Sequence, residues 1–181
     1  MALTPTLWRT SRVLAGPARL DLLRRILAAP GTRVADLAAA AGLSESRASQ
    51  ELRRLQARGV VQAVRQGPGV AYQPVTDPTV ATAKPLLAAA KAALAKRPME
   101  ETIRVAKAFG HERRLNIVRA LREGPRGFAE LAAMAGMPEM ALFRHLRVLR
   151  AGGMVRKAKR GWELAPNAHP LARTFGALVA D

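Results

Sequence analysis

The sequence contains no cysteine, few aromatic residues and no long apolar run. Without cysteine the chain has no disulfide framework, no thiolate zinc site and no cysteine nucleophile. No apolar run approaches the roughly 18 residues that a bilayer-spanning helix requires. The first residues lack the basic and apolar regions of a signal peptide. We therefore expect a soluble, cytoplasmic protein with no membrane partner.

Acidic residues are also scarce. Aspartate and glutamate total 13 against 30 lysines and arginines, which gives a net charge of +17. Such an excess favours polyanionic partners, because a protein that neutralises phosphates releases condensed counterions. Hydrophobic residues make up 49% of the chain, enough to build a core. These features predict a folded protein whose partner is a polyanion, with nucleic acid favoured.

The chain is an internal tandem repeat. Residues 38–43, AAAAGL, align with residues 132–137, AAMAGM, and the same offset of 94 pairs Leu52-Arg53 with Leu146-Arg147. Upstream the offset becomes 95, and it pairs Arg19-Leu20 with Arg114-Leu115. The length changes fall at turns, which are the places where loops tolerate insertions. We infer two copies of one structural unit.

Each copy shows the same order of expected elements. In the first copy a helix opens at Thr4-Pro5, and apolar spacing over residues 20–27 indicates a second. A short helix over 34–41 ends at Gly42, and Ser44 caps a longer helix that continues to about residue 58. Residues 60–73 read as a hairpin around Gly67-Pro68-Gly69. This is the order of a winged helix-turn-helix.

The repeat defines the expected domains. Residues 1–77 form the first winged-helix domain, and residues 98–181 form the second with a C-terminal helix over 170–180. Residues 78–97 form a connector, helical to residue 96. The fold class is therefore mainly α with small β-hairpin wings, an α+β arrangement of duplicated winged-helix domains.

Residues 144–155, RHLRVLRAGGMV, resemble the recognition-helix signature of ArsR-type (arsenical-resistance repressor) winged-helix regulators. Residues 42–52 resemble the same segment, and RLDLL and RLNIV at 19–23 and 114–118 resemble the helix before it. The resemblance implies a repressor-like transcriptional regulator, not an enzyme. It also implies that the partner is double-stranded DNA, that each long helix enters the major groove and that each wing lies along the backbone or minor groove.

The first recognition helix carries polar side chains near its N-terminus, off its apolar stripe. Residues at such positions contact base edges in helix-turn-helix proteins. The candidates for base contact are Ser46, Arg47, Ser49 and Gln50. Candidates for phosphate contact are Arg53, Arg54 and Arg58. The alternative is an ordinary solvated face whose arginines pair with Glu51 and its neighbours.

The second recognition helix departs from this pattern, with Met140 and Phe143 at positions expected to be polar. These two could contact thymine methyl groups, or they could pack against a neighbouring domain or subunit. The remaining candidates for base contact are Arg144 and His145, with Arg147 for phosphates.

The second wing is strongly basic, whereas the first wing carries only Arg65 as a charged residue. The second wing's backbone candidates are Arg156, Lys157, Lys159 and Arg160. We hypothesise that the first unit reads the DNA sequence and that the second unit binds the DNA backbone.

Many ArsR-type relatives sense metals through a Cys-x-Cys pair at the start of the short helix. The matching positions hold Arg33 and Ala35 in one unit and Gly127 and Ala129 in the other. None of these residues is a thiolate ligand for a soft metal. The three histidines show no metal-binding spacing along the chain either. We expect no metal and no cofactor.

In ArsR-type relatives, the first and last helices of each unit form a homodimer. Here the two units could pair internally as a pseudo-dimer, or the connector could hold them apart and mediate a homodimer. Two further function classes stay open beside the regulator. One is a weakly specific architectural, chromosome-associated DNA-binding protein, and the other is a protein-interaction module. The residues expected at the pairing surface are Leu7, Trp8, Leu86, Leu87, Ile103 and the terminal helix.

Overall fold

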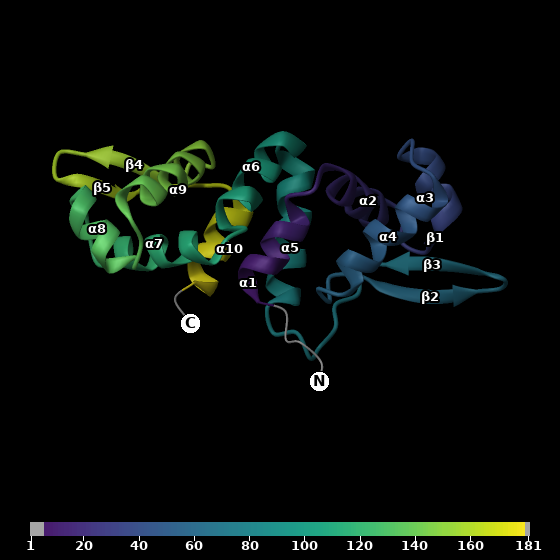
Figure 1. Ribbon diagram of the computed structural model, residues 1–181. Coiled ribbons are helices and arrows are strands. Elements are labelled where there is room, and N and C mark those ends of the chain that lie inside the picture. The colour runs from purple at the N-terminus through teal and green to yellow at the C-terminus, as the bar shows by residue number, and fades with distance from the viewer. Residues whose placement is uncertain (1–5, 180–181) are drawn as a thin grey trace.

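Two small units lie at opposite ends of an elongated molecule and are joined by a central group of helices (Figure 1). The computed structural model describes residues 6–179. Thr4 and Pro5, which we expected to open the first helix, and Ala180, expected in the last helix, lie outside the described residues. The architecture confirms the predicted tandem α+β fold.

In the first unit, local signals set the ends of the two helices of the helix-turn-helix. Gly42 has a φ of 63°, the left-handed conformation that ends a helix. The Ser44 hydroxyl accepts a hydrogen bond from the Arg47 amide and caps the next helix, as predicted. The elements are α1 (Leu7–Leu14), α2 (Pro17–Ala28), β1 (Thr32–Arg33), α3 (Val34–Ala40), α4 (Glu45–Gln56), β2 (Gln62–Gln66) and β3 (Gly69–Gln73).

The wing of the first unit has one more strand than the sequence predicted. The two-residue strand β1 pairs antiparallel with β3, with Thr32 opposite Tyr72. The second unit has a single bridge between Arg126 and Trp162 at the equivalent place. Gly161 is required there, because its φ is 117° and a Cβ on it would collide with the Arg126 carbonyl. In both units, therefore, the segment that precedes the short helix pairs with the second strand of the wing.

The second unit repeats the order of the first. Its helices and strands are α6 (Met99–Phe109), α7 (Glu112–Arg122), α8 (Phe128–Met134), α9 (Glu139–Ala151), β4 (Val155–Ala158), β5 (Gly161–Leu164) and α10 (Pro170–Leu178).

The connector helix is α5 (Ala83–Lys96). Our prediction that this helix begins at residue 78 is wrong. The Asp77 carboxylate accepts hydrogen bonds from the amide and hydroxyl of Thr79, and this local turn delays the helix.

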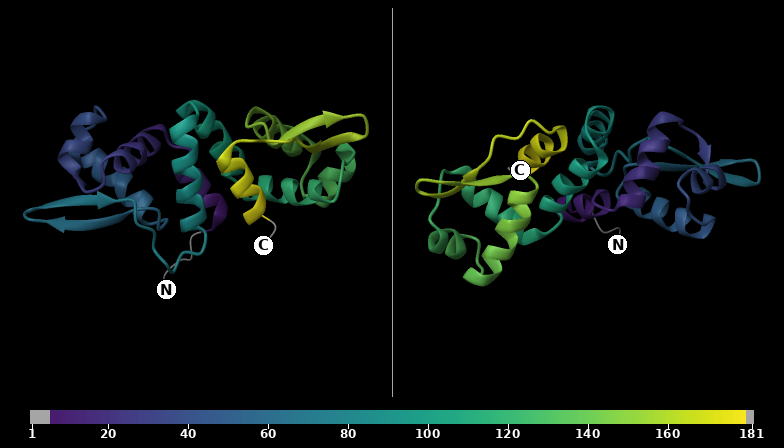
Figure 2. Two further views of the ribbon diagram at one scale, coloured as in Figure 1. Left: turned by 180° about the vertical axis from the view of Figure 1, so that it is seen from behind. Right: turned by 90° about the horizontal axis from the view of Figure 1, so that it is seen from above.

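The first helix of each unit, the connector helix α5 and the last helix α10 pack together at the centre of the molecule (Figure 2). Helix α1 lies against α6, and the Ser11 hydroxyl donates a 2.6 Å hydrogen bond to the Ala106 carbonyl. Helix α10 lies against α5 and α6, and the Phe109 and Phe175 rings stack at 4.8 Å. A single cluster of buried side chains runs through both units and these helices.

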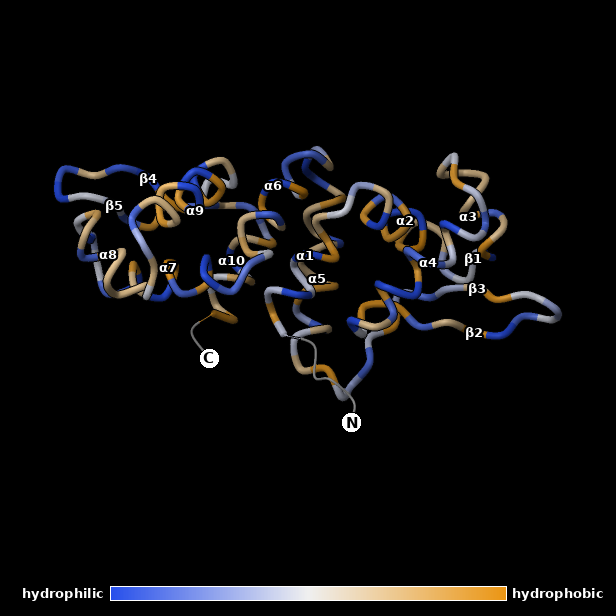
Figure 3. Tube along the Cα trace, viewed as in Figure 1, coloured by the Kyte–Doolittle hydropathy of each residue, from blue (hydrophilic) through white to orange (hydrophobic). Residues whose placement is uncertain are grey.

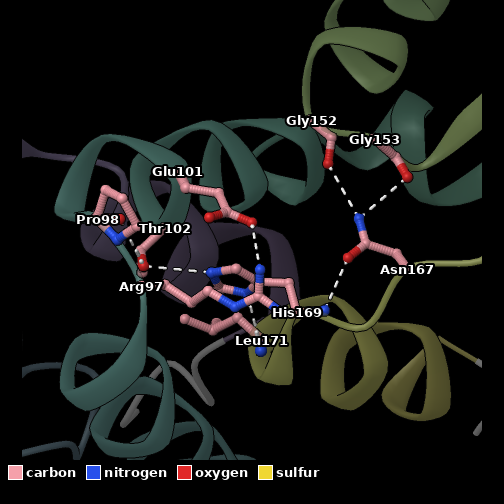
Figure 4. Close-up of polar contacts among 9 residues, drawn as sticks. All are labelled: Arg97, Pro98, Glu101, Thr102, Gly152, Gly153, Asn167, His169 and Leu171. Atoms are coloured by element: carbon pink, nitrogen blue, oxygen red, sulfur yellow. Dashed lines mark hydrogen bonds and ion pairs between the residues drawn. The ribbon is translucent and has the colours of Figure 1, made fainter.

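A buried histidine fixes the last helix to the rest of the second unit (Figure 4). His169 is 1% exposed and caps α10, with its Nδ1 accepting from the Leu171 amide. Its Nε2 lies 3.2 Å from the Thr102 hydroxyl, which itself donates to the Pro98 carbonyl. Asn167 links the same turn to α9 by donating to the Gly152 and Gly153 carbonyls. Because Nδ1 must accept, the ring has to be neutral.

This arrangement predicts a loss of stability in acid. Burial lowers the pKa of His169, as does Arg97, although Glu101 opposes the shift. Above the ordinary histidine pKa of about 6.5 both folded and unfolded states are neutral, so nothing is lost. Below it the unfolded state binds the proton first, and the free energy of unfolding falls as pH falls. Urea unfolding at pH 7.5 and pH 5 should show this decline.

The substitution His169→Asn separates this effect from the rest of the chain. Asparagine is a good N-cap without a titrating ring, so the variant should lose less stability than the wild type between pH 7.5 and pH 5. His169→Ala should cost about 1 kcal/mol at pH 7.5 through loss of the cap. An identical pH dependence in the wild type and the asparagine variant would contradict the assignment.

Candidate nucleic-acid interface

Both helix-turn-helix pairs lie on one side of the molecule. In the view from above (Figure 2, right), α3–α4 and α8–α9 both lie along the lower edge of the picture. This edge is the side of the molecule that faces the viewer in Figure 1. The wings β2–β3 and β4–β5 point outward at the two far ends (Figure 1). A long nucleic acid lying along this side would meet both recognition helices.

The polar residues of α4 that the sequence predicts to contact bases lie on its accessible side. Ser46, Arg47 and Gln50 are exposed and Ser49 is half-buried, while Ala48, Leu52 and Leu55 are fully buried on the opposite side. Among residues 6–179, Arg47 and Arg53 form no ion pair. Two guanidinium groups on this helix are therefore available to a ligand.

One carboxylate on the inner flank of α4 holds two arginines. Glu51 is 9% exposed, and its Oε2 accepts a 2.6 Å hydrogen bond from Arg19 on α2. Arg54 also donates to Glu51, at 3.1 Å. Burial alone would raise the pKa of Glu51, but Arg19 and Arg54 lower it below its usual value. The alternative expectation of arginines paired with Glu51 therefore applies to Arg54 and not to Arg47 or Arg53.

The outer face of α9 is more apolar. Met140 is 69% exposed and Phe143 58%, and Met134 on α8 is also exposed. Arg144 and Arg147 are exposed beside them. The structure thus places an apolar patch where α4 has hydroxyl and amide groups, with arginines as its polar members.

His145 lies on a different side of α9 from these residues. It is half-buried, and its ring lies 4.8 Å from the ring of His111, which caps α7. Burial lowers the pKa of both histidines, and Arg113 and Arg114 lower them further. This pair was not predicted from the sequence, because the two residues are far apart in the chain. Among the described residues, no third histidine or acidic side chain joins this pair in a potential metal site.

The part of the chain that the structure describes contains no cluster of three or more histidine or acidic side chains that could hold a metal. Within that part, no helix combines the length and the hydrophobicity needed to cross a membrane.

The two wings differ in charge. All of β2 is exposed, and Arg65 is its one charged residue. The turn joining β4 and β5 is hydrophilic (Figure 3), and the second wing exposes Arg156, Lys157, Lys159 and Arg160. The Arg156 Nε donates a 2.6 Å hydrogen bond to Glu163 on the facing strand. Three of these four cations are therefore without an ion pair among the described residues.

Comparison with known families gives two matches, one on each unit. Residues 111–157 match the model of the bacterial regulatory proteins of the arsR family. Residues 16–69 match the model of the MarR family. No curated protein and no solved structure matches the chain. Each matched segment runs from the beginning of the second helix of its unit into the wing. The chain is a DNA-binding regulator with two winged helix-turn-helix units in tandem. The predicted similarity to ArsR-type proteins is confirmed for the second unit, whereas the first unit matches the MarR family.

Proposed function

We propose that one chain binds two adjacent half-sites of duplex DNA as a sequence-specific, repressor-like regulator. Helices α4 and α9 enter successive major grooves, and the wings lie along the backbone. The observation that carries this proposal is the packing of α1 on α6 and of α5 on α10, together with the two helix-turn-helix pairs on one side. Half-sites for such paired units lie one helical turn, about 34 Å, apart.

The pairing of the two units replaces a second copy of the chain. ArsR-type relatives dimerise through their first and last helices, and here those helices already contact each other within one chain. Leu86 is fully buried, Leu87 and Ile103 are 9% and 8% exposed, and Leu7 and Trp8 pack against the same core. We infer that the protein is a monomeric pseudo-dimer with no need of a partner subunit.

Native mass spectrometry tests this arrangement. We expect a free species of 19.4 kDa and a complex of one chain with one duplex. An obligate dimer in the absence of DNA would overturn the pseudo-dimer, because it would require another surface to be buried. The measurement is independent of which DNA sequence the protein prefers.

The bound site should be non-palindromic, because the two recognition helices differ. Ser46, Arg47, Ser49 and Gln50 offer hydrogen bonds to base edges, and their equivalents in α9 are Met140, Ala141, Phe143 and Arg144. Exposed apolar side chains can contact thymine methyl groups. Genome-wide footprinting should therefore reveal one half-site with a defined base pattern beside a different, thymine-containing one.

Competition with bulk genomic DNA separates this function from an architectural role. At physiological salt a specific regulator prefers its site by about 10³-fold or more. A ratio near one would favour the architectural alternative, to which the net charge of +17 also points. Failure to bind either DNA would favour the protein-interaction alternative. Regulation through a thiolate metal site is not part of the proposal, because the relevant positions hold no sulfur ligand.

A further inference from the structure

Helices α1, α2 and α4 border an open hollow that is lined mainly by guanidinium groups. Its volume is about 420 Å³, and its lining includes Trp8, Arg9, Arg12, Arg19, Arg54 and Arg58. The Arg9 guanidinium lies over the Trp8 ring at 5.1 Å from its centroid. Four arginines from α1, α2 and α4, together with Arg58 from the turn after α4, therefore converge on one small space.

The charge of this hollow is only partly balanced. Glu51 is bonded to Arg19 and Arg54. Within residues 6–179, Arg9, Arg12 and Arg58 form no ion pair, and the buried Nε of Arg58 has no hydrogen-bond partner. A buried donor without an acceptor is unfavourable, and a small shift of the Arg58 side chain toward an anion in the hollow would give this donor an acceptor.

The repeat shows that this chemistry is particular to the first unit. The equivalent hollow of the second unit, between α6 and α9, has a volume of about 220 Å³ and is lined by Arg104, Lys107 and Arg147 with apolar neighbours. At the offset of 94, Arg54 corresponds to Val148 and Arg58 to Gly152. Two cations and the buried donor are therefore absent from the second hollow.

We propose that the hollow of the first unit binds a phosphate-type oxyanion. Guanidinium groups match phosphate oxygens with paired, charge-assisted hydrogen bonds, and several arginines can share one phosphate group. The anion has two possible sources, a backbone phosphate of bound DNA or a free phosphorylated small molecule. The first source rests on the proposed DNA-binding function, whereas the second does not. Arg54 lies in the last turn of α4 and Arg58 in the turn that follows this recognition helix, so a free anion would compete with DNA for them.

Equilibrium dialysis of labelled pyrophosphate against the full chain tests the free-anion source. Ionic strength is held constant with sodium chloride, so that general screening is equal in every sample. We expect one saturable site per chain, weakened at least tenfold by the double substitution Arg12→Gln/Arg58→Gln. The matched control Arg104→Gln/Lys107→Gln removes the same charge from the second hollow and should change the affinity less than twofold. Urea unfolding of both variants verifies that each is folded.

Binding of an operator duplex by the same variants tests the DNA source. If pyrophosphate does not bind but the first variant loses at least five times more DNA affinity than the control, the phosphate comes from DNA and the proposal stands. If pyrophosphate binding is absent or equal in both variants, and DNA affinity falls equally in both, the proposal is overturned. Specific DNA binding by the wild type in that case would leave the proposed function intact.

Discussion

Replacing the four cations of the second wing with glutamine should reduce the affinity for DNA about 100-fold at 0.15 M salt. The slope of log K against log salt should fall by about 3, because each lost phosphate contact removes about 0.9. The residues are Arg156, Lys157, Lys159 and Arg160, all exposed. The expected change is close to three contacts and not four, because Arg156 is bonded to Glu163.

Fluorescence anisotropy with a labelled duplex measures both the affinity and the slope when the salt concentration is varied from about 0.05 to about 0.3 M. The single substitution Arg65→Gln in the first wing is the matched control, and it should lower the slope by about 1. An unchanged slope in the quadruple variant would show that this wing does not contact the backbone. Because the four side chains are exposed, the free energy of unfolding should change little.

Much of the fold follows from signals that are local in the chain. The left-handed Gly42 and the capping Ser44 bracket the turn of the first helix-turn-helix, and both can be recognised from a few neighbouring residues. The stripe of Ala48, Leu52 and Leu55 fixes which side of α4 is buried and so which side is free. The outward direction of Ser46, Arg47 and Gln50 was predictable for that reason.

The features that the sequence analysis missed depend on contacts between distant segments. His111 and His145 meet only because α7 and α9 pack together. The arginine hollow likewise combines α1 with α4, and β1 exists only through its pairing with β3. Periodicity along one helix cannot predict such encounters, because each depends on how two elements are oriented in space.

The contact that fixes the recognition helix to the second helix of its unit differs between the two units. In each unit an arginine at the start of the second helix donates its Nε to a backbone carbonyl, Arg19 to Val13 and Arg114 to Ala108. Arg19 also bonds to Glu51 on α4. At the position equivalent to Glu51 the second unit has His145. The first unit therefore has an Arg19–Glu51 ion pair between α2 and α4. In the second unit the Arg114 guanidinium faces the half-buried imidazole of His145 instead.

Glu51→Gln should destabilise the protein by about 2 kcal/mol. The side chains of Arg19 and Glu51 are 18% and 12% exposed, so the loss lies between that of a surface pair, about 0.5 kcal/mol, and that of a fully buried pair, about 3 to 5 kcal/mol. The variant leaves Arg19 and Arg54 without their carboxylate. Urea unfolding measures the effect, and Glu45→Gln, an exposed change on the same helix, should cost less than about 0.5 kcal/mol. Equal losses in the two variants would show that the pair contributes nothing.

The reciprocal change His145→Glu should stabilise the second unit and reduce its sensitivity to acid. In the wild type, burial and the neighbouring His111, Arg114 and Arg113 lower the pKa of His145, so the folded state resists the proton that the unfolded state accepts below about pH 6.5. A glutamate there would face Arg114 as Glu51 faces Arg19, and an ion pair of that partly buried kind contributes about 1 kcal/mol. Unfolding at pH 7.5 and pH 5 should show a smaller decline than in the wild type. A larger decline would mean that Arg114 does not reach the new carboxylate, and that the two units hold their recognition helices by unrelated contacts.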